Sequence, residues 1–378
     1  MSALAVERSR AIDQSGWGED FRLVQPHNLA FWVYCALVIA GAYVLFGQVS
    51  IAAAAYSGAL ASGIIAFGLV AVAYVWFIHY EDRYTTVPRD LAATGFVWGF
   101  VAATGAFALL ANGAVMDLYA KVLGASFAFD WGAALAAPVD EEFAKGAGVL
   151  LLLTLAPKLI RSPFDGLILG AFVGLGFQIS EDISYAWIGA ANSFGDVGAA
   201  WSTIIVRTLA SIPSHWMYTA IFGAGLIWFV GRPNFPARRG LGAALMLTAM
   251  LMHGVWDASG AIAGSSVFGW IVPLAVATVL ISVFVWIYKT TQPIEREWMR
   301  ELMAPEVALG VVSADELNAL AGTRSTLKSF ISAQPDPRTA RHVLTAENEL
   351  AHQIARDGGA ETAAVQRARA AVMEARRA

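Results

Sequence analysis

Four ionisable residues stand close together inside an otherwise apolar stretch, residues 131–155. They are Asp140, Glu141, Glu142 and Lys145. Adjacent carboxylates on a helix point about 100° apart, and Lys145 lies i+4 from Glu141 and i+3 from Glu142, so it can neutralise one of them. The other carboxylate then stays available as a general base for proton transfer. The alternative is an internal ion pair that only holds helices together.

Three further apolar stretches carry ionisable residues: Glu181 in 166–189, Arg207 and His215 in 202–230, and His253 with Asp257 in 241–263. The i, i+4 spacing puts Asp257 on the same helix face as His253, where it can orient the imidazole. Plainer interpretations stay open: a helix end for Glu181, snorkelling instead of substrate binding for Arg207, and a satisfied core position for each histidine.

These side chains are predicted to lie at one depth. Glu142, Glu181, His215 and His253 are 12 to 15 residues from the expected cytoplasmic ends of their stretches. At about 1.5 Å per residue this is roughly 18–23 Å. By this measure Glu142 is favoured over Glu141 as the base. Imidazoles and carboxylates gathered in one layer suit a metal-dependent hydrolytic site, because neutral histidines and a carboxylate can hold zinc and leave one position for water.

Composition indicates which elements position these residues. The chain of 378 residues is 57% apolar and 14% charged, against about 45–50% and 25% in soluble domains. Eight stretches approach the roughly 20 residues that a membrane-crossing helix needs: 28–47, 57–78, 91–111, 131–155, 166–189, 202–230, 241–263 and 267–288. We therefore predict an all-α, polytopic membrane protein with about eight transmembrane helices in the lipid bilayer. Pro213 is expected to kink the sixth span.

Charge distribution predicts the orientation and the division of the chain. The N-terminal arm and every second loop carry ten Lys/Arg residues, whereas the opposite loops carry Lys121 alone, so both termini should be cytoplasmic. Residues 289–378 hold 12 of the 25 Lys/Arg and 12 of the 29 Asp/Glu. We expect a cytoplasmic arm at 1–27, a membrane domain at 28–288 and a small cytoplasmic helical tail at 289–378. The first span should be retained, because it is too long for a signal peptide.

The tail is expected to hold two or three short helices broken at four prolines, with a last helix over 337–376 interrupted at Gly358 and Gly359. The prolines are Pro293, Pro305, Pro335 and Pro337. A net charge of −4 gives no reason to expect nucleic acid as a partner. The single cysteine, Cys35, excludes an internal disulfide and a cysteine-based zinc cluster.

Four motifs resemble those of the PrsW family of bacterial intramembrane proteases, which is related to the CAAX-prenyl protease and bacteriocin-processing group. The motifs are Glu141-Glu142-x-x-Lys145, Phe177-x-x-x-Glu181, the stretch from Arg207 to His215, and His253-x-x-x-Asp257. The resemblance implies a protease of the bacterial cell membrane that makes the first cut in a membrane-anchored anti-sigma factor. It puts Glu141 and Glu142 in the catalytic motif, with Glu181, His215 and His253 as partners. The wider group often has His where this chain has Glu181.

The prediction is a multi-pass intramembrane endopeptidase that hydrolyses peptide bonds of a membrane-anchored protein near the outer half of the bilayer. One of Glu141 and Glu142 acts as base, and His215, His253 and Glu181 bind zinc or position the water. Lys145 and Asp257 support these groups, and Arg207 helps to bind substrate. The alternatives are a proton-coupled transporter that uses the same Glu and His residues, or a non-catalytic scaffold that acts through its tail.

Overall fold

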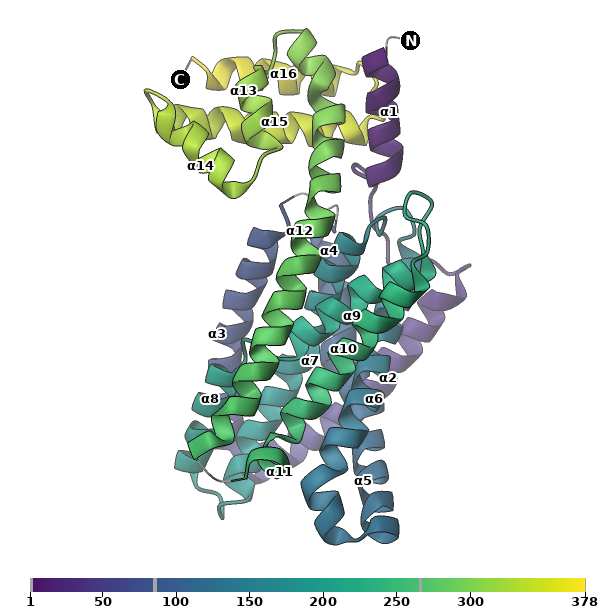
Figure 1. Cartoon of the computed structure of the whole chain (residues 1–378), viewed down its shortest axis with the longest axis vertical. Helices are drawn as coiled ribbons and strands as arrows, with labels where there is room; N and C mark the ends of the chain where they lie inside the picture. The colour runs from purple at the N-terminus through teal and green to yellow at the C-terminus, as the bar shows by residue number, and fades with distance from the viewer. Residues whose placement is uncertain (1–2, 84–86, 265–266, 378) are drawn as a thin grey trace.

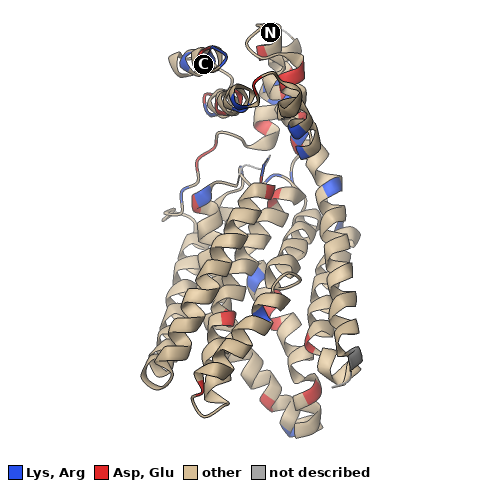
Figure 2. Ribbon diagram, turned by 90° about the vertical axis from the view of Figure 1, so that its left-hand side faces the viewer, with Lys and Arg blue, Asp and Glu red and all other residues tan. Residues whose placement is uncertain are grey.

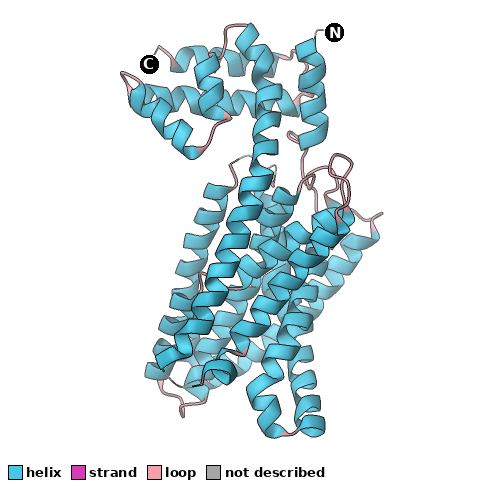
Figure 3. Ribbon diagram, viewed as in Figure 1, coloured by secondary structure: helices cyan, strands magenta, loops and turns pink. Residues whose placement is uncertain are grey.

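The chain folds into helices, as Figure 3 shows in a computed structural model that describes residues 3–83, 87–264 and 267–377. Across these ranges the only extended pairing is an isolated bridge between Arg232 and Phe235. The fold is therefore all-α, as the sequence predicts.

The helices form a long bundle topped by a second, smaller group (Figure 1). The bundle contains α2 (Leu29–Ala55), α3 (Ser57–Glu81), α4 (Arg89–Val97), the π-helix η1 (Trp98–Ala108), α5 (Leu109–Leu123), α6 (Ala125–Leu155), α7 (Pro163–Ala191), α8 (Val197–Ala210), α9 (His215–Val230), α10 (Arg239–Asp257), α11 (Ser259–Ala263), the short 3₁₀ turn η2 (Val267–Trp270) and the first half of α12 (Ile271–Ala308). The terminal module contains α1 (Ala3–Ser15), the second half of α12, α13 (Ala314–Leu320), α14 (Arg324–Ala333), α15 (Pro337–Arg356) and α16 (Ala363–Ala375).

Five helical segments in the described ranges are long and apolar enough to cross a membrane. They are Leu29–Ala55, Ser57–Glu81, Arg89–Leu123, Pro163–Ala191 and Ile271–Ala308. The polytopic membrane fold is thereby confirmed. The remaining three predicted spans correspond to α6, to α8 with α9, and to α10, and the count of eight stays a prediction.

The sixth predicted span, 202–230, is divided into two helices instead of one kinked helix. α8 ends at Ala210 and α9 begins at His215. Pro213 has no backbone N–H and disfavours helical geometry in the residue before it, so the chain leaves the helix and starts a new one. As a consequence His215 lies in the first turn of α9, next to the break.

α7 and α9 approach each other closely along a row of glycines. A Cβ at Gly166, Gly170 or Gly174 would collide with the α9 backbone, at Gly223, Thr219 and His215 in turn. Small residues at four-residue spacing allow such backbone-to-backbone packing inside membranes. The row therefore fixes the position of His215 against α7, the helix that also carries Glu181.

α12 differs from the sequence prediction, because Pro293 and Pro305 lie inside a continuous helix. A proline in a helix interior costs about 3 kcal/mol, and burial of α12 side chains in the terminal module offsets this cost. Leu302 and Met303 are buried there, and the Leu302 carbonyl accepts a hydrogen bond from Arg8 Nε at 2.9 Å. The boundary expected at Lys289, between the membrane domain and the cytoplasmic tail, therefore falls in the middle of α12.

The two ends of the chain form one module. Trp17 from the N-terminal arm shares a hydrophobic core with Leu302, Leu350 and Ile354. Four helices follow α12, more than the two or three expected, and the interruption at 357–362 contains the predicted Gly358 and Gly359. Figure 2 shows charged residues concentrated in this module and sparse along the bundle.

Candidate active site

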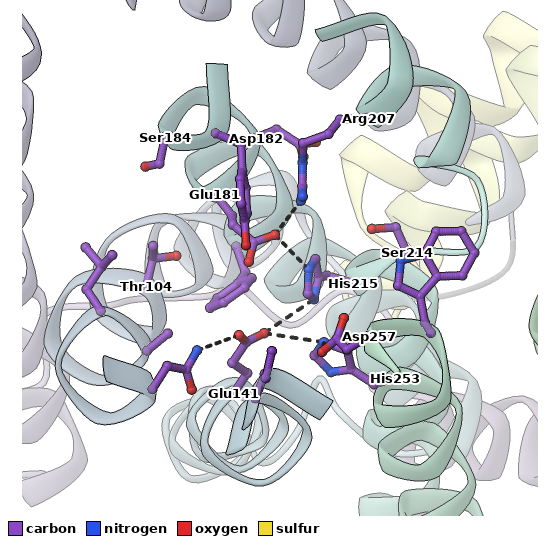
Figure 4. Close-up of a pocket in the computed structure, with 18 of the residues that line it drawn as sticks. Thr104, Glu141, Glu181, Asp182, Ser184, Arg207, Ser214, His215, His253 and Asp257 are labelled. Carbon is purple, nitrogen blue, oxygen red and sulfur yellow. Dashed lines mark hydrogen bonds and ion pairs between the residues drawn. The ribbon is translucent and has the colours of Figure 1, made fainter. Parts of the chain in front are cut away.

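A cavity of about 510 Å³ opens within the bundle between η1, α5, α6, α7, α8, α9 and α10. Figure 4 shows acidic, basic and imidazole side chains from these helices converging on it. The ionisable residues that line it are Glu141, Glu181, Asp182, Tyr185, Arg207, His215, Tyr218, His253 and Asp257. Ionisable residues from separate predicted spans therefore meet in one cavity, as the sequence predicts.

Glu141 lies between the two imidazoles. Its Oε2 atom is 3.6 Å from His215 Nδ1 and 3.7 Å from His253 Nε2. Its Oε1 atom accepts a hydrogen bond from Asn112 Nδ2 at 2.9 Å. The side chain is almost fully buried, and Oε2 has no hydrogen-bond donor among the described residues. One carboxylate oxygen is thus fixed and the other faces the imidazoles.

Glu142 is also fully buried, but it is not among the residues that line the cavity. Its carboxylate lies 2.6 Å from Lys145 Nζ, accepts a hydrogen bond from Thr219 Oγ1 at 3.1 Å and lies 3.3 Å from His253 Nδ1. Depth along the span favours Glu142 as the base, but depth does not determine in which direction the side chains of Glu141 and Glu142 point. The geometry favours Glu141 for the position that faces the cavity.

Lys145 is completely buried beneath these groups. Besides its contact with Glu142, its Nζ atom lies 3.5 Å from Glu141 Oε2 and 3.1 Å from His215 Nδ1. The ammonium also sits 4.3 Å from the centre of the Phe177 ring. The pairing at i+3 and i+4 that the sequence indicates is therefore present, with Glu142 as the nearer partner.

Arg207 binds two acids of α7. Its Nη2 atom lies 2.5 Å from Glu181 Oε2, its Nε atom donates to Asp182, and its guanidinium stacks on Tyr185 at 4.1 Å. Glu181 Oε2 also lies 3.0 Å from His215 Nε2. Arg207 thus neutralises and positions Glu181, and its expected part in substrate binding stays a prediction.

His253 is held from two sides. Asp257 Oδ2 lies 3.5 Å from His253 Nε2, and the Tyr218 ring stacks on the imidazole with centroids 4.9 Å apart and planes 11° apart. The His215 and His253 rings are themselves 4.9 Å apart. The i, i+4 pairing of His253 with Asp257 is therefore present, and both imidazoles are fixed against Glu141.

The chemistry of this donor set fits a divalent metal. Glu141, His215 and His253 each offer one ligand atom, and these atoms lie within 4.8 Å of one another. The surrounding cluster holds five carboxylates and two cationic side chains, so negative charge is in excess when the imidazoles are neutral. Burying excess charge is costly, and a divalent cation would compensate it. The grouping contains Glu141 where the sequence prediction has Glu181.

Asn112 is a functional candidate that the sequence interpretation missed. It comes from α5, which carries none of the four motifs, and it fixes the orientation of Glu141 through the hydrogen bond to Oε1. The available signal was a lone carboxamide in the apolar run around residue 110, because polar side chains inside membrane spans are costly and tend to be functional.

Comparison with known proteins identifies relatives with a described activity. The family model described as "PrsW family intramembrane metalloprotease" matches residues 87–288, more than half of the chain. The Protease PrsW of Geobacillus kaustophilus (strain HTA426) is 27% identical over 192 residues, which cover 49% of this chain and 74% of the relative.

The Protease PrsW of Clostridioides difficile (strain 630) is 28% identical over 143 residues, which cover 38% of this chain and 54% of the relative. No solved structure matches the chain. The resemblance that the four motifs predict is confirmed by these comparisons, and the matched region contains every residue of the cavity cluster.

Proposed function

We propose, from the premise that this chain belongs to the PrsW family of intramembrane metalloproteases, that Glu141 activates the water that cuts the substrate. The observation that carries the proposal is Glu141 Oε2, a buried carboxylate oxygen without a donor in the described chain that lies between two imidazoles. A general base must reach the proton that it removes, and of the adjacent pair Glu141 and Glu142 only Glu141 lines the cavity.

The proposed reaction is hydrolysis of a peptide bond. Glu141 takes a proton from water while the water oxygen attacks the carbonyl carbon of the substrate. The proton is then delivered to the amide nitrogen as the carbon–nitrogen bond breaks, which yields a carboxylic acid and an amine. Water is consumed, and Glu141 returns to its starting state.

The neighbouring side chains prepare Glu141 for this task. Asn112 fixes Oε1, so that Oε2 keeps facing the imidazoles. Lys145 holds Glu142 at 2.6 Å and so balances the second carboxylate of the motif. Glu181 and Asp257 each lie against one imidazole, at 3.0 and 3.5 Å, and set the orientation of the rings.

The family description implies a metal, and we propose that His215 and His253 hold it, with Glu141 Oε2 within reach of the water beside it. Zinc is the ion that suits imidazole ligands with a position left for water. The ion would supply Lewis acidity, which makes water easier to deprotonate near neutral pH. Glu181 is proposed as a positioning residue for His215, because it already pairs with Arg207.

The proposed substrate is a membrane-anchored protein, with an anti-sigma factor as the specific candidate, cut in the outer half of the bilayer. The support is the family's membrane location and the cavity itself, which is lined by bundle residues alone and by none of the terminal module. Both termini are proposed to be cytoplasmic in the bacterial cell membrane, because Lys and Arg gather in the loops on that side.

The test uses the purified full chain in lipid vesicles with a single-span substrate, one apolar helix of about 20 residues joined to a fluorescent domain. Glu141→Gln keeps the size of the side chain and removes the base. We expect cleavage to fall by about 100-fold or more. Glu297→Gln, an exposed position in the terminal module, serves as the matched control and should cleave at the wild-type rate. Wild-type cleavage by Glu141→Gln would refute the proposed base.

A further inference from the structure

One wall of the cavity is only partly packed against the rest of the protein. α5, whose residues Leu109–Leu123 are all described, contains no buried residue, and it packs on α6 and η1. Figure 1 shows α5 and α6 as a hairpin that extends beyond the other helices at the end far from the terminal module. Leu109 and Leu110 are exposed on it. α5 therefore presents an apolar face to the bilayer.

The same helix reaches the catalytic cavity. Leu109, Asn112, Gly113 and Met116 line it from the α5 side. α8 lines it from another side with Val206, Arg207 and Ala210, and Figure 4 shows Thr104 of η1 and Arg207 on different sides of the opening. α8 itself packs on α3 and α7. α5 and α8 thus both border the cavity, and each of them packs on other helices of the bundle.

Gly113 marks an open place on this border. A Cβ built at Gly113 would meet no heavy atom of the described chain within 4 Å, whereas one at Gly99 or Gly105 of the adjoining η1 would collide with the backbone of a neighbouring helix. Inside membranes, small residues allow another helix to come close. The glycines of η1 already have such a neighbour, and Gly113 has the space for one.

The inner side of α5 is tied to the catalytic group. Asn112 donates to Glu141 Oε1 at 2.9 Å, and the Met116 side chain lies against the Cβ position of Gly132 on α6. A helix docked at Gly113 would therefore lie one residue along the chain from the side chain that orients Glu141.

We propose that the face of α5 centred on Gly113 is the docking surface for the membrane-spanning helix of the substrate, which enters from the bilayer between α5 and α8. The occupant is an apolar helix, because the surface is apolar apart from the exposed Asp117 one turn further along α5, lies at membrane depth and is continuous with the cavity in which the peptide bond must be cut. The docking surface rests on the proposed proteolytic function, since it supplies the route to Glu141.

The first experiment fills the open place. Gly113→Leu adds a side chain where there is room for one, so the fold should be retained. Gly68→Leu is the matched control, because Gly68 lies in mid-helix on α3, also has no heavy atom within 4 Å of its Cβ position and does not line the cavity. We expect Gly113→Leu to lower kcat/KM for the single-span substrate by at least about tenfold, through KM, and Gly68→Leu to match the wild type.

Equal cleavage by Gly113→Leu and Gly68→Leu would overturn the docking surface while leaving the proteolytic function intact. Failure of the wild-type protein to cleave, or full activity of Glu141→Gln, would instead overturn the proposed function. The two failures are therefore distinguishable in one assay.

The second experiment measures docking without cleavage. Cys35 is the single cysteine, so Cys35→Ser gives a background without thiols, to which Glu141→Gln is added to keep the substrate whole. Gly113→Cys and Gly68→Cys are then treated with a bismaleimide in the presence of a substrate helix that carries one cysteine at mid-span. We expect a cross-link to Gly113→Cys and none to Gly68→Cys. Equal cross-linking of both, or of neither, would count against the site.

Discussion

The bundle and the terminal module both bury charged side chains, but they balance them differently. In the module, Glu306 is completely buried; its Oε1 accepts hydrogen bonds from Arg8 and Arg369 at 2.7 and 2.9 Å, and its Oε2 accepts one from Arg369 at 2.7 Å. In the bundle, carboxylates outnumber cationic side chains, and Glu141 Oε2 is left without a donor from the described residues.

The difference separates charges that build a fold from charges kept for chemistry. A buried carboxylate matched by two arginines is satisfied and holds α1, α12 and α16 together. A buried carboxylate oxygen without a donor is costly, and such atoms gather at functional sites. Glu295 and Glu347 are exceptions among the buried carboxylates of the module, since one oxygen of each also has no donor within the described chain. Glu347 provides a sensitive test of the comparison.

The largest effect should come from removing an imidazole of the bundle cluster. We expect His215→Ala and His253→Ala each to lower cleavage by about 100-fold or more and to lose bound metal, because each removes one of the three grouped ligand atoms. Metal analysis of the purified protein beside the cleavage assay checks both. His342→Ala, at an exposed position of the module, is the control. Full metal content in both cavity variants would contradict the assigned ligands.

A large structural effect should come from Glu306→Gln, which leaves the buried Arg8 facing a neutral amide, while the partly exposed Arg369 keeps its partner Glu361. Removing one partner of a buried ion pair costs about 3 kcal/mol or more, so α1 and α16 should open far more often. Hydrogen exchange of these helices in the full chain measures the change. Glu301→Gln removes the half-buried partner of the exposed Arg10 and should cost less than about 1 kcal/mol. Equal exchange in the two variants would break the distinction between matched and unmatched charge.

The smallest effect concerns the pH dependence of the module. Burial and the neighbouring Glu316 carboxylate raise the pKa of Glu347 from 4.5 to about 9. Between these values the folded chain holds a proton that the unfolded chain releases, so this contribution to stability is complete below about pH 4.5 and is lost as the pH rises through about 9. Glu347→Gln should remove that loss.

The measurement is the exchange rate of α15 at pH 6 and pH 9, corrected for the intrinsic pH dependence of exchange. The wild type should lose protection at pH 9 relative to Glu347→Gln, and Glu349→Gln, an exposed neighbour on α15, should follow the wild type. Parallel behaviour of Glu347→Gln and the wild type would show that Glu347 is ionised throughout.

Much of the cavity cluster could be predicted because charge is rare in a membrane helix. Glu181, His215 and His253 stand out from apolar surroundings, and equal depth on separate helices brings them together. Rotation about the helix axis could not be predicted in the same way. Glu141 and Glu142 differ by one residue in depth, and only packing of α6 against α9 and α10 decides which of them faces the cavity.

In the terminal module, the glycine break could be predicted from the sequence, whereas the length of α12 could not. Gly358 and Gly359 marked a real interruption, since each adopts a positive φ of 60° or 78° that favours glycine. Pro293 and Pro305 did not end α12, because the burial of Leu302 and Met303 depends on helices far away in the sequence. Local rules describe a proline well in isolation, and they do not include the tertiary contacts that outweigh it.

The glycine row on α7 has a consequence for genetics. Gly170 and Gly174 contain no functional group, yet a methyl at either would push away the backbone that carries His215. A random screen for inactive alleles should therefore recover these glycines beside the acids and imidazoles, with protein that still reaches the membrane. Along α7, the positions nearest to α9 would then tolerate substitution least, even where they lie far from the bond that is cut.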